Sequence, residues 1–190
     1  MKKVYLVTGN RHKLEEFEAI LAPLGIEVTP IRLEKLEVQA DDVAVIARYA
    51  AERLPVIDAP VAVEDAGLFI KALRGFPGPY SSYVYRTLGL EGVLKLMSDV
   101  DDRHAYFLSA IGVKDTEGHV HVFTGRVDGS IARSPRGSGG FGFDPIFVPE
   151  GWEKTFAEAS MEEKNSVSHR ARAARALAEW LLYGGPISGR

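Results

Sequence analysis

The chain contains no cysteine among its 190 residues. A disulfide framework, a cysteine-bound zinc site and a thiol nucleophile are therefore excluded. Long apolar runs are also lacking, since none approaches the length of a membrane span. The apolar run after Met1-Lys2-Lys3 is too short for the hydrophobic part of a signal peptide. These features predict a soluble, cytoplasmic protein that engages no membrane.

An excess of positive charge is missing as well. The formal net charge is -3 at pH 7, which argues against a nucleic-acid polymer as partner but leaves room for a local cationic pocket. The sequence has neither internal repeats nor low-complexity tracts, and its 46% hydrophobic and 26% charged residues are typical of a globular protein. We expect residues 1–190 to form a single domain, which the length would allow to have two lobes.

Strand and helix patterns alternate in the first third of the chain, as in an α/β layer. They predict strands at 4–7 and 26–31 and a short strand at 61–63 that ends on two acids. The first helix should be capped by Asn10 and end at Gly25, with Leu14, Phe17, Leu21 and Leu24 facing inward. The second should be capped by Asp41 or Asp42, with Leu54 among its inward residues.

The rest of the chain adds antiparallel strands and a final helix. Residues 105–114 and 120–127 predict a hairpin around the turn at 115–118. The sequence after Gly89 predicts a short helix, and residues 134–142 are predicted to form a loop. Ser168 should cap a last helix with inward Ala171, Ala174, Ala178 and Leu181, which ends at Gly184-Gly185-Pro186. The predicted fold is therefore α/β, with a mixed parallel and antiparallel sheet flanked by helices.

The stretch TGNRHK places cations in the first turn of a predicted helix, where the backbone dipole normally favours acids. Free N–H groups at a strand-to-helix turn bind anions, and Gly9 would allow a ligand to approach closely. A polyphosphate would explain the cations, whereas the alternative is a solvated helix start with an Arg11–Glu15 pair. The Walker pattern GxxxxGK[ST] is lacking here. The candidate phosphate-binding residues are Thr8, Gly9, Asn10, Arg11, His12 and Lys13.

The stretch VAVEDAGL places Glu64 and Asp65 at the predicted carboxyl end of a strand, where α/β sheets bind ligands. Carboxylates beside a phosphate site are suited to Mg²⁺, which prefers oxygen ligands. Glu37, which precedes the second predicted helix, could join them. The alternative is a turn with exposed acids.

Two further stretches could contact a base. In GSGGFGFDPIF, Phe141 and Phe143 offer flat faces for stacking, although a structural Gly-rich turn is the alternative. In EEKNSVSHRAR, Lys164, His169 and Arg170 are predicted to gather at a helix start and could donate hydrogen bonds to a keto oxygen or phosphate. An ordinary surface or core histidine is the alternative for that stretch.

Taken in order, TGNRHKLEEF, VEDAGL, GFPGPYS, GGFGFDPIF and EKNSVSHR give the chain a specific resemblance. From Thr8 to about Trp180 it resembles the inosine triphosphate pyrophosphatase family. The resemblance implies hydrolysis of ITP, dITP and XTP to the monophosphate and pyrophosphate with Mg²⁺. It also implies an elongated fold with two lobes around a central cleft, and a homodimer.

The resemblance also implies roles for individual residues. Residues 8–13 would hold the triphosphate, Glu37 and Asp65 would bind Mg²⁺, and Asp65 would accept a proton, with Glu64 still in contention. The implied substrate contacts further along the chain are Ala66, Phe141, Gly142, Phe143, Asp144, Lys164, His169 and Arg170. Two alternatives remain open, a pyrophosphatase for modified pyrimidine nucleotides and a nucleotide-binding regulator without catalysis.

Overall fold

A mixed β-sheet runs through the middle of the computed structural model, which describes residues 1–184. Within these residues the sheet has seven strands in the order β2-β1-β3-β5-β6-β7, with β4 paired to β3. The strands are β1 (Lys2–Val7), β2 (Ile26–Ile31), β3 (Val61–Ile70), β4 (Pro77–Gly78), β5 (His104–Lys114), β6 (Val120–Ile131) and β7 (Phe147–Pro149). Pairings among β2, β1 and β3 are parallel and the others are antiparallel, which confirms the predicted mixed α/β fold.

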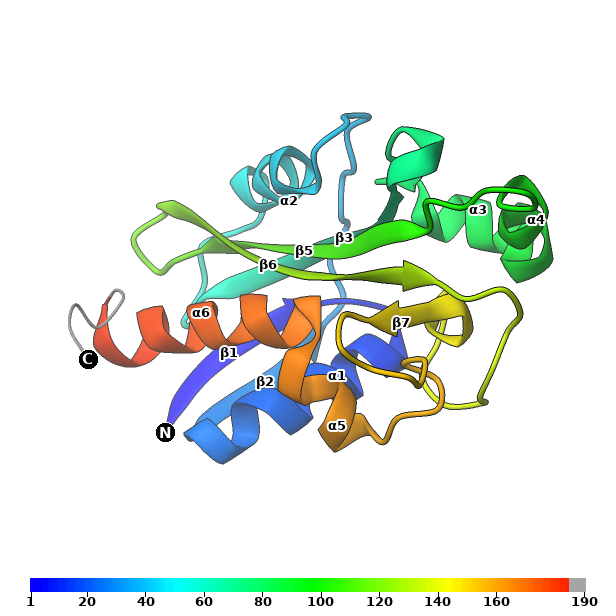
Figure 1. Cartoon of the computed structure of the whole chain (residues 1–190). Helices are drawn as coiled ribbons and strands as arrows, with labels where there is room; N and C mark the ends of the chain where they lie inside the picture. The colour runs from blue at the N-terminus through cyan, green and yellow to red at the C-terminus, as the bar shows by residue number, and fades with distance from the viewer. Residues whose placement is uncertain (185–190) are drawn as a thin grey trace.

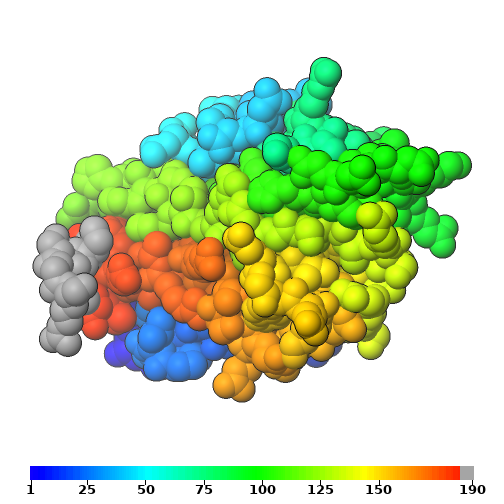
Figure 2. Space-filling model, in the orientation of Figure 1, coloured from blue at the N-terminus to red at the C-terminus, as the bar shows by residue number. Residues whose placement is uncertain are grey.

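Helices cover both faces of the sheet (Figure 1). They are α1 (Arg11–Leu21), α2 (Val43–Glu52), α3 (Ser81–Thr87), α4 (Gly89–Leu96), α5 (Met161–Val167) and α6 (His169–Tyr183). Figure 1 shows α2 on one face of the central strands, α1, α5 and α6 on the other, and α3 with α4 beyond one end. On the face shown in Figure 2, the orange and red C-terminal segments lie between the blue N-terminal segments and the green hairpin of β5 and β6. Within residues 1–184, no helix combines the length and apolar character needed to cross a membrane.

The two largest apolar clusters of the described residues both contain side chains of β3 and β5. One packs α1 and α6 against β1, with Phe17 and Leu177 among its fully buried side chains. The other gathers the second half of β3 with α3, α4, β6 and β7 around Phe147 and Phe156. Glu64 of β3 and Ser109 of β5 lie between these two clusters along their strands.

The predicted helix signals of the first third are confirmed with one exception. The Asn10 side chain accepts a hydrogen bond from the Lys13 backbone N–H at 3.2 Å and caps α1. Asp42, not Asp41, caps α2 through the backbone N–H of Ala44 at 2.8 Å. Leu24, predicted to face inward, is 43% exposed, because α1 ends at Leu21 and a short 3₁₀ turn redirects the chain.

The prediction that a short strand ends at Glu64 and Asp65 is wrong. β3 continues to Ile70 and stays paired with β5 along its whole length, because the residues that follow the acids are again apolar. Gly67 suits this position, since a Cβ there would lie 2.2 Å from the carbonyl oxygen of Gly78 in β4. The two acids therefore lie in mid-strand, where alternation sends their side chains to opposite faces.

The C-terminal helix begins as predicted, although its neighbour was not expected. The Ser168 hydroxyl accepts a hydrogen bond from the Ala171 backbone N–H at 3.1 Å and caps α6. Lys164 does not lie at this helix start but within the separate helix α5, which a capping box at Ser160 begins. Gly184 ends α6 with a φ of 74°, and Gly185 and Pro186 lie outside the described residues. The hairpin and the loop at 134–142 are confirmed.

Candidate active site

A cleft of about 1180 Å³ opens where the β1–α1 turn, β3, α3, the 140–144 loop and the start of α6 meet. Almost every site residue predicted from the sequence lines it: Thr8, Gly9, Asn10, His12, Lys13, Glu37, Glu64, Asp65, Ala66, Phe141, Gly142, Phe143, Asp144, Lys164, His169 and Arg170. Arg11 is the exception among them. Its 89% exposed side chain forms the i,i+4 ion pair with Glu15 at 2.7 Å, which was the alternative interpretation.

The β1–α1 turn is preorganised by its own side chains. The Thr8 hydroxyl accepts a hydrogen bond from the Asn10 backbone N–H at 3.0 Å, next to the Asn10 cap. A Cβ built on Gly9 would meet no atom within 4 Å, so packing of the fold does not require glycine there. The missing side chain instead leaves room in the cleft beside the positive end of α1, as an anion site needs.

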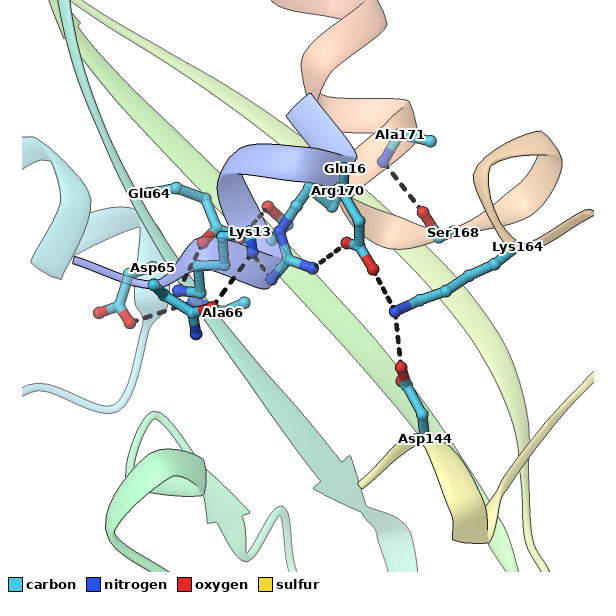
Figure 3. Close-up of polar contacts among 12 residues, drawn as sticks. Lys13, Glu16, Glu64, Asp65, Ala66, Asp144, Lys164, Ser168, Arg170 and Ala171 are labelled. Carbon is cyan, nitrogen blue, oxygen red and sulfur yellow. Dashed lines mark hydrogen bonds and ion pairs between the residues drawn. The ribbon is translucent and has the colours of Figure 1, made fainter. Parts of the chain in front are cut away.

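Glu64 is the buried centre of an ion-pair group (Figure 3). Its carboxylate forms ion pairs with Lys13 at 2.7 Å and with Arg170 at 3.2 Å, and it accepts a hydrogen bond from the Ser109 hydroxyl at 2.8 Å. Burial alone would raise the pKa of Glu64, but the charges of Arg170 and Lys13 outweigh it and hold that pKa well below its usual range. Glu64 is therefore a carboxylate that orients cations.

Glu16, which the sequence analysis missed, links this group to the opposite wall (Figure 3). Its two oxygens accept hydrogen bonds from Lys164 at 2.5 Å and from Arg170 at 2.6 Å. Lys164 also donates to Asp144 at 2.6 Å. All four side chains are at least nine-tenths buried, and the arrangement ties α1, α5, α6 and the 140–144 loop together.

The ring of Phe141 lies across from these cations. The Asp144 carboxylate accepts a hydrogen bond from the Phe141 backbone N–H at 3.0 Å, which fixes the loop. The Lys164 ammonium lies 4.9 Å from the ring centroid, and the imidazole of His12 stacks on the ring with centroids 5.3 Å apart. Phe143, by contrast, is 4% exposed and belongs to the second apolar cluster.

His169 is a buried neutral ring at the floor of the cleft. Burial first, and then the charges of Arg170 and Lys164, lower its pKa well below the usual range. Its imidazole stacks on Phe107 with centroids 4.6 Å apart. Within residues 1–184, Nδ1 has no hydrogen-bond partner, so it is available to a ligand.

Asp65 is an acid of the cleft whose pKa lies above its usual range. Its side chain accepts a hydrogen bond from the Ala66 backbone N–H at 3.0 Å. Burial raises its pKa to about 6, although the charges of Lys35 and Lys13 act in the opposite direction. The charges of Glu37 and Glu64 act in the same direction as burial. Glu37 is 57% exposed in its side chain and pairs with Lys35 at 2.7 Å.

These acids fit a magnesium ion that brings further ligands with it. Residues 1–184 contain no cluster of three or more His, Cys, Asp or Glu side chains that could hold a metal ion. Mg²⁺ is commonly bound by one or two carboxylates together with waters and substrate phosphates. Glu37 and Asp65 line the same cleft, and the charge of one raises the pKa of the other, so they match that donor set.

Sequence reasoning missed Glu16, which holds two residues of the cleft in place, and several residues that line the cleft itself. Glu16 carried a usable signal, because it falls beside Phe17 and four residues before Ile20 on the buried stripe of α1. Lys35 lies in an irregular segment with no periodic pattern, and Tyr80, Tyr83 and Arg86 belong to α3 or its start, a short helix that was not predicted.

Known proteins resemble the chain over nearly its whole length. A sequence model of the Ham1 family matches residues 4–180. The dITP/XTP pyrophosphatase of Ignicoccus hospitalis is 53% identical over 95% of this chain and 97% of its own, and that of Hyperthermus butylicus is 52% identical over 96% of each.

Among solved structures, the Staphylococcus aureus Ham1 protein has a TM-score of 0.77 and 29% identity and covers 95% of this chain and 98% of its own. A Coxiella burnetii HAM1 protein has a TM-score of 0.77 and 31% identity and covers 96% and 99%. The chain therefore belongs to the Ham1 family.

Proposed function

We propose that the chain hydrolyses nonstandard purine nucleoside triphosphates, ITP, dITP and XTP, to the nucleoside monophosphate and pyrophosphate. The observation that carries this proposal is the meeting, in one cleft, of a helix-start anion site, two acids suited to a metal ion and a buried group of donors beside an aromatic ring. Relatives with identities of 52–53% are named dITP/XTP pyrophosphatases. The enzyme would remove such nucleotides from the free pool.

The triphosphate would lie at the β1–α1 turn, with Lys13 and the first-turn N–H groups on its oxygens. Glu37 and Asp65 would hold Mg²⁺, whose positive charge would stabilise negative charge that develops on the phosphate oxygens. Water would attack the α-phosphorus. The bond between that phosphorus and the oxygen that bridges it to the β-phosphorus would then break, and pyrophosphate would leave.

Asp65 is the better proton acceptor of the two adjacent acids. Burial raises the pKa of Asp65 to about 6 in the metal-free protein, so before Mg²⁺ binds its carboxylate is the more basic of the two. Arg170 and Lys13 hold the pKa of Glu64 far below neutral pH, and its carboxylate already forms ion pairs with both cations and accepts a hydrogen bond from Ser109. The proton of the attacking water would therefore pass to the Asp65 carboxylate.

The base would stack on Phe141 and accept hydrogen bonds from side chains of α5 and α6. Hypoxanthine and xanthine carry a 6-keto acceptor where adenine carries an amino donor. Arg170, buried and fixed by Glu16 and Glu64, would donate to the keto oxygen and be left unpaired by adenine, a penalty of roughly 1–3 kcal/mol. His169 and Lys164 would complete this end of the pocket.

A product assay tests the function. Purified protein with Mg²⁺ should convert ITP, dITP and XTP to monophosphate and pyrophosphate, with much slower turnover of ATP. Release of orthophosphate, or a preference for modified pyrimidine nucleotides in the same panel, would contradict the proposal. Tight nucleotide binding without any turnover would instead indicate a regulator.

The family resemblance also supports a proposal about the oligomeric state and cellular location of the protein. We infer a homodimer that acts in the cytoplasm, where the nucleotide pool is found. Light scattering on the eluted protein would give the mass of the particle, and a mass close to one 20.8 kDa chain would contradict the dimer.

A further inference from the structure

Lys35 places an ammonium group among the acids of the cleft, although it lies in the irregular segment between β2 and α2. Its Nζ forms an ion pair with the Glu37 carboxylate at 2.7 Å and donates a hydrogen bond to the backbone carbonyl of Glu64 at 2.9 Å. The Lys35 side chain is 20% exposed, whereas that of Glu37 is 57% exposed. The lysine therefore anchors the more exposed carboxylate to β3.

The same ammonium is held beside Asp65. The carbonyl to which it donates belongs to Glu64, the residue before Asp65 in β3, and Lys35, Glu37 and Asp65 all line the same cleft. Its positive charge therefore reduces the mutual repulsion of the two acids. A cation that pairs with the Glu37 carboxylate at 2.7 Å and bonds to the backbone of the strand that carries Asp65 at 2.9 Å supplies the charge that a bound metal ion would otherwise supply.

We propose that Lys35 is a resident counter-cation, which balances the charge of the Glu37–Asp65 pair until a metal–nucleotide complex arrives. This inference rests on the proposed function. In the nucleotide-free enzyme Lys35 keeps Glu37 in the cleft and disfavours a metal ion that comes alone. The triphosphate brings both extra metal ligands and negative charge, and the lysine then turns from Glu37 to a phosphate oxygen.

The chemistry of each partner supports this exchange. Two carboxylates beside a fixed positive charge are a poor site for a free divalent ion, which would have to approach the ammonium without compensation. Lysine has a flexible four-carbon stem and a compact charge, so it can change partners within one cleft more readily than a forked guanidinium. Lys13 could not perform this role without releasing buried Glu64, which it pairs at 2.7 Å.

The test is a comparison of ligand binding by the wild type, Lys35→Met and Lys35→Gln, with exposed Lys95→Met as the matched control. Calorimetry without nucleotide measures Mg²⁺ affinity, and a second titration measures pyrophosphate affinity without metal. Loss of the lysine charge should tighten Mg²⁺ binding by about tenfold and weaken pyrophosphate binding by a similar factor. Lys35→Gln retains a donor for the Glu64 carbonyl, so it reports on charge even where Lys35→Met is poorly folded.

Unchanged or weaker Mg²⁺ binding in Lys35→Gln would overturn the proposal, because a lysine that merely holds Glu37 in place predicts weaker binding. Unchanged pyrophosphate binding would also overturn it, since the released ammonium would then not reach the phosphates. Neither readout depends on turnover, so absence of ITP hydrolysis by the wild type would reject the proposed function separately.

Discussion

Replacement of Asp65 by asparagine should abolish turnover and at the same time stabilise the metal-free protein at neutral pH. Asp65 is 9% exposed, and burial raises its pKa from 3.8 to about 6. An acid with a higher pKa in the folded protein than in the unfolded chain binds its proton more tightly when folded. Its ionisation therefore costs folding free energy, a cost absent well below pH 3.8 and complete above about pH 6.

The magnitude follows from the shift. A rise of roughly two pKa units corresponds to about 3 kcal/mol, an upper figure because the wild type can relax around the charge. The amide that Asp65→Asn introduces would keep a side-chain oxygen for the Ala66 N–H group but carry no charge. We expect the variant to gain roughly 2–3 kcal/mol at about pH 7.5, and most of that gain to vanish at about pH 4.5, where the wild-type acid is largely protonated when folded.

Urea unfolding with a chelator present measures this difference at both pH values. The exposed acid Asp101 offers the control, because Asp101→Asn changes the same chemical group without removing a buried charge. A variant that is less stable than the wild type at neutral pH, or a gain in stability that does not change with pH, would show that Asp65 is not ionised at a cost in the folded protein. Near-normal ITP hydrolysis by Asp65→Asn would refute its role as the proton acceptor.

Two other substitutions test the base end of the cleft. Arg170→Ala should reduce the preference for ITP over ATP in kcat/KM by about tenfold or more, and should cost about 3–5 kcal/mol of stability because buried Glu16 and Glu64 lose a shared partner. An unchanged ratio in a folded protein would contradict the reading role of Arg170. His12→Ala should lower KM for ITP by roughly 2–5-fold with kcat unchanged, because the base no longer has to displace the imidazole from Phe141. A raised KM would mean that His12 itself binds the substrate.

The elements with complete local signals could be predicted from the sequence. Asn10, Ser168 and the turn after Lys114 each combine a cap or turn residue with an apolar period, and each lies where it was expected. The prediction of β3 failed because two acids in succession look like the end of a strand. Local sequence does not reveal that Lys13 and Arg170 come from two distant segments to pair with the Glu64 carboxylate inside the sheet. Nor does it reveal that Lys35, from a third segment, donates to the Glu64 carbonyl.

The residues that line the cleft were likewise easier to predict than the ion pairs that its charged side chains form. Cations at helix starts indicated an anion site, and Lys13, His169 and Arg170 do converge on one cleft. Glu16 was missed because an acid on an amphipathic helix is normally solvent-facing, and its burial depends on Lys164 and Arg170 from the far end of the chain. Arg11 was placed in the site although the i,i+4 pair with Glu15 satisfies it locally.

The buried charges explain why this cleft can select a base as well as attract phosphate. Three cations, Lys13, Lys164 and Arg170, face three buried acids, Glu16, Glu64 and Asp144. Because each cation is paired with an acid, the donors of the cleft are held by short bonds before the substrate enters. Arg170 directs Nε, Nη1 and Nη2 to the two glutamates, so its guanidinium plane is fixed by the protein. A fixed N–H group forms a hydrogen bond with a keto oxygen but cannot rotate to avoid an amino group, so it is left unpaired. This difference would favour 6-keto purines over adenine.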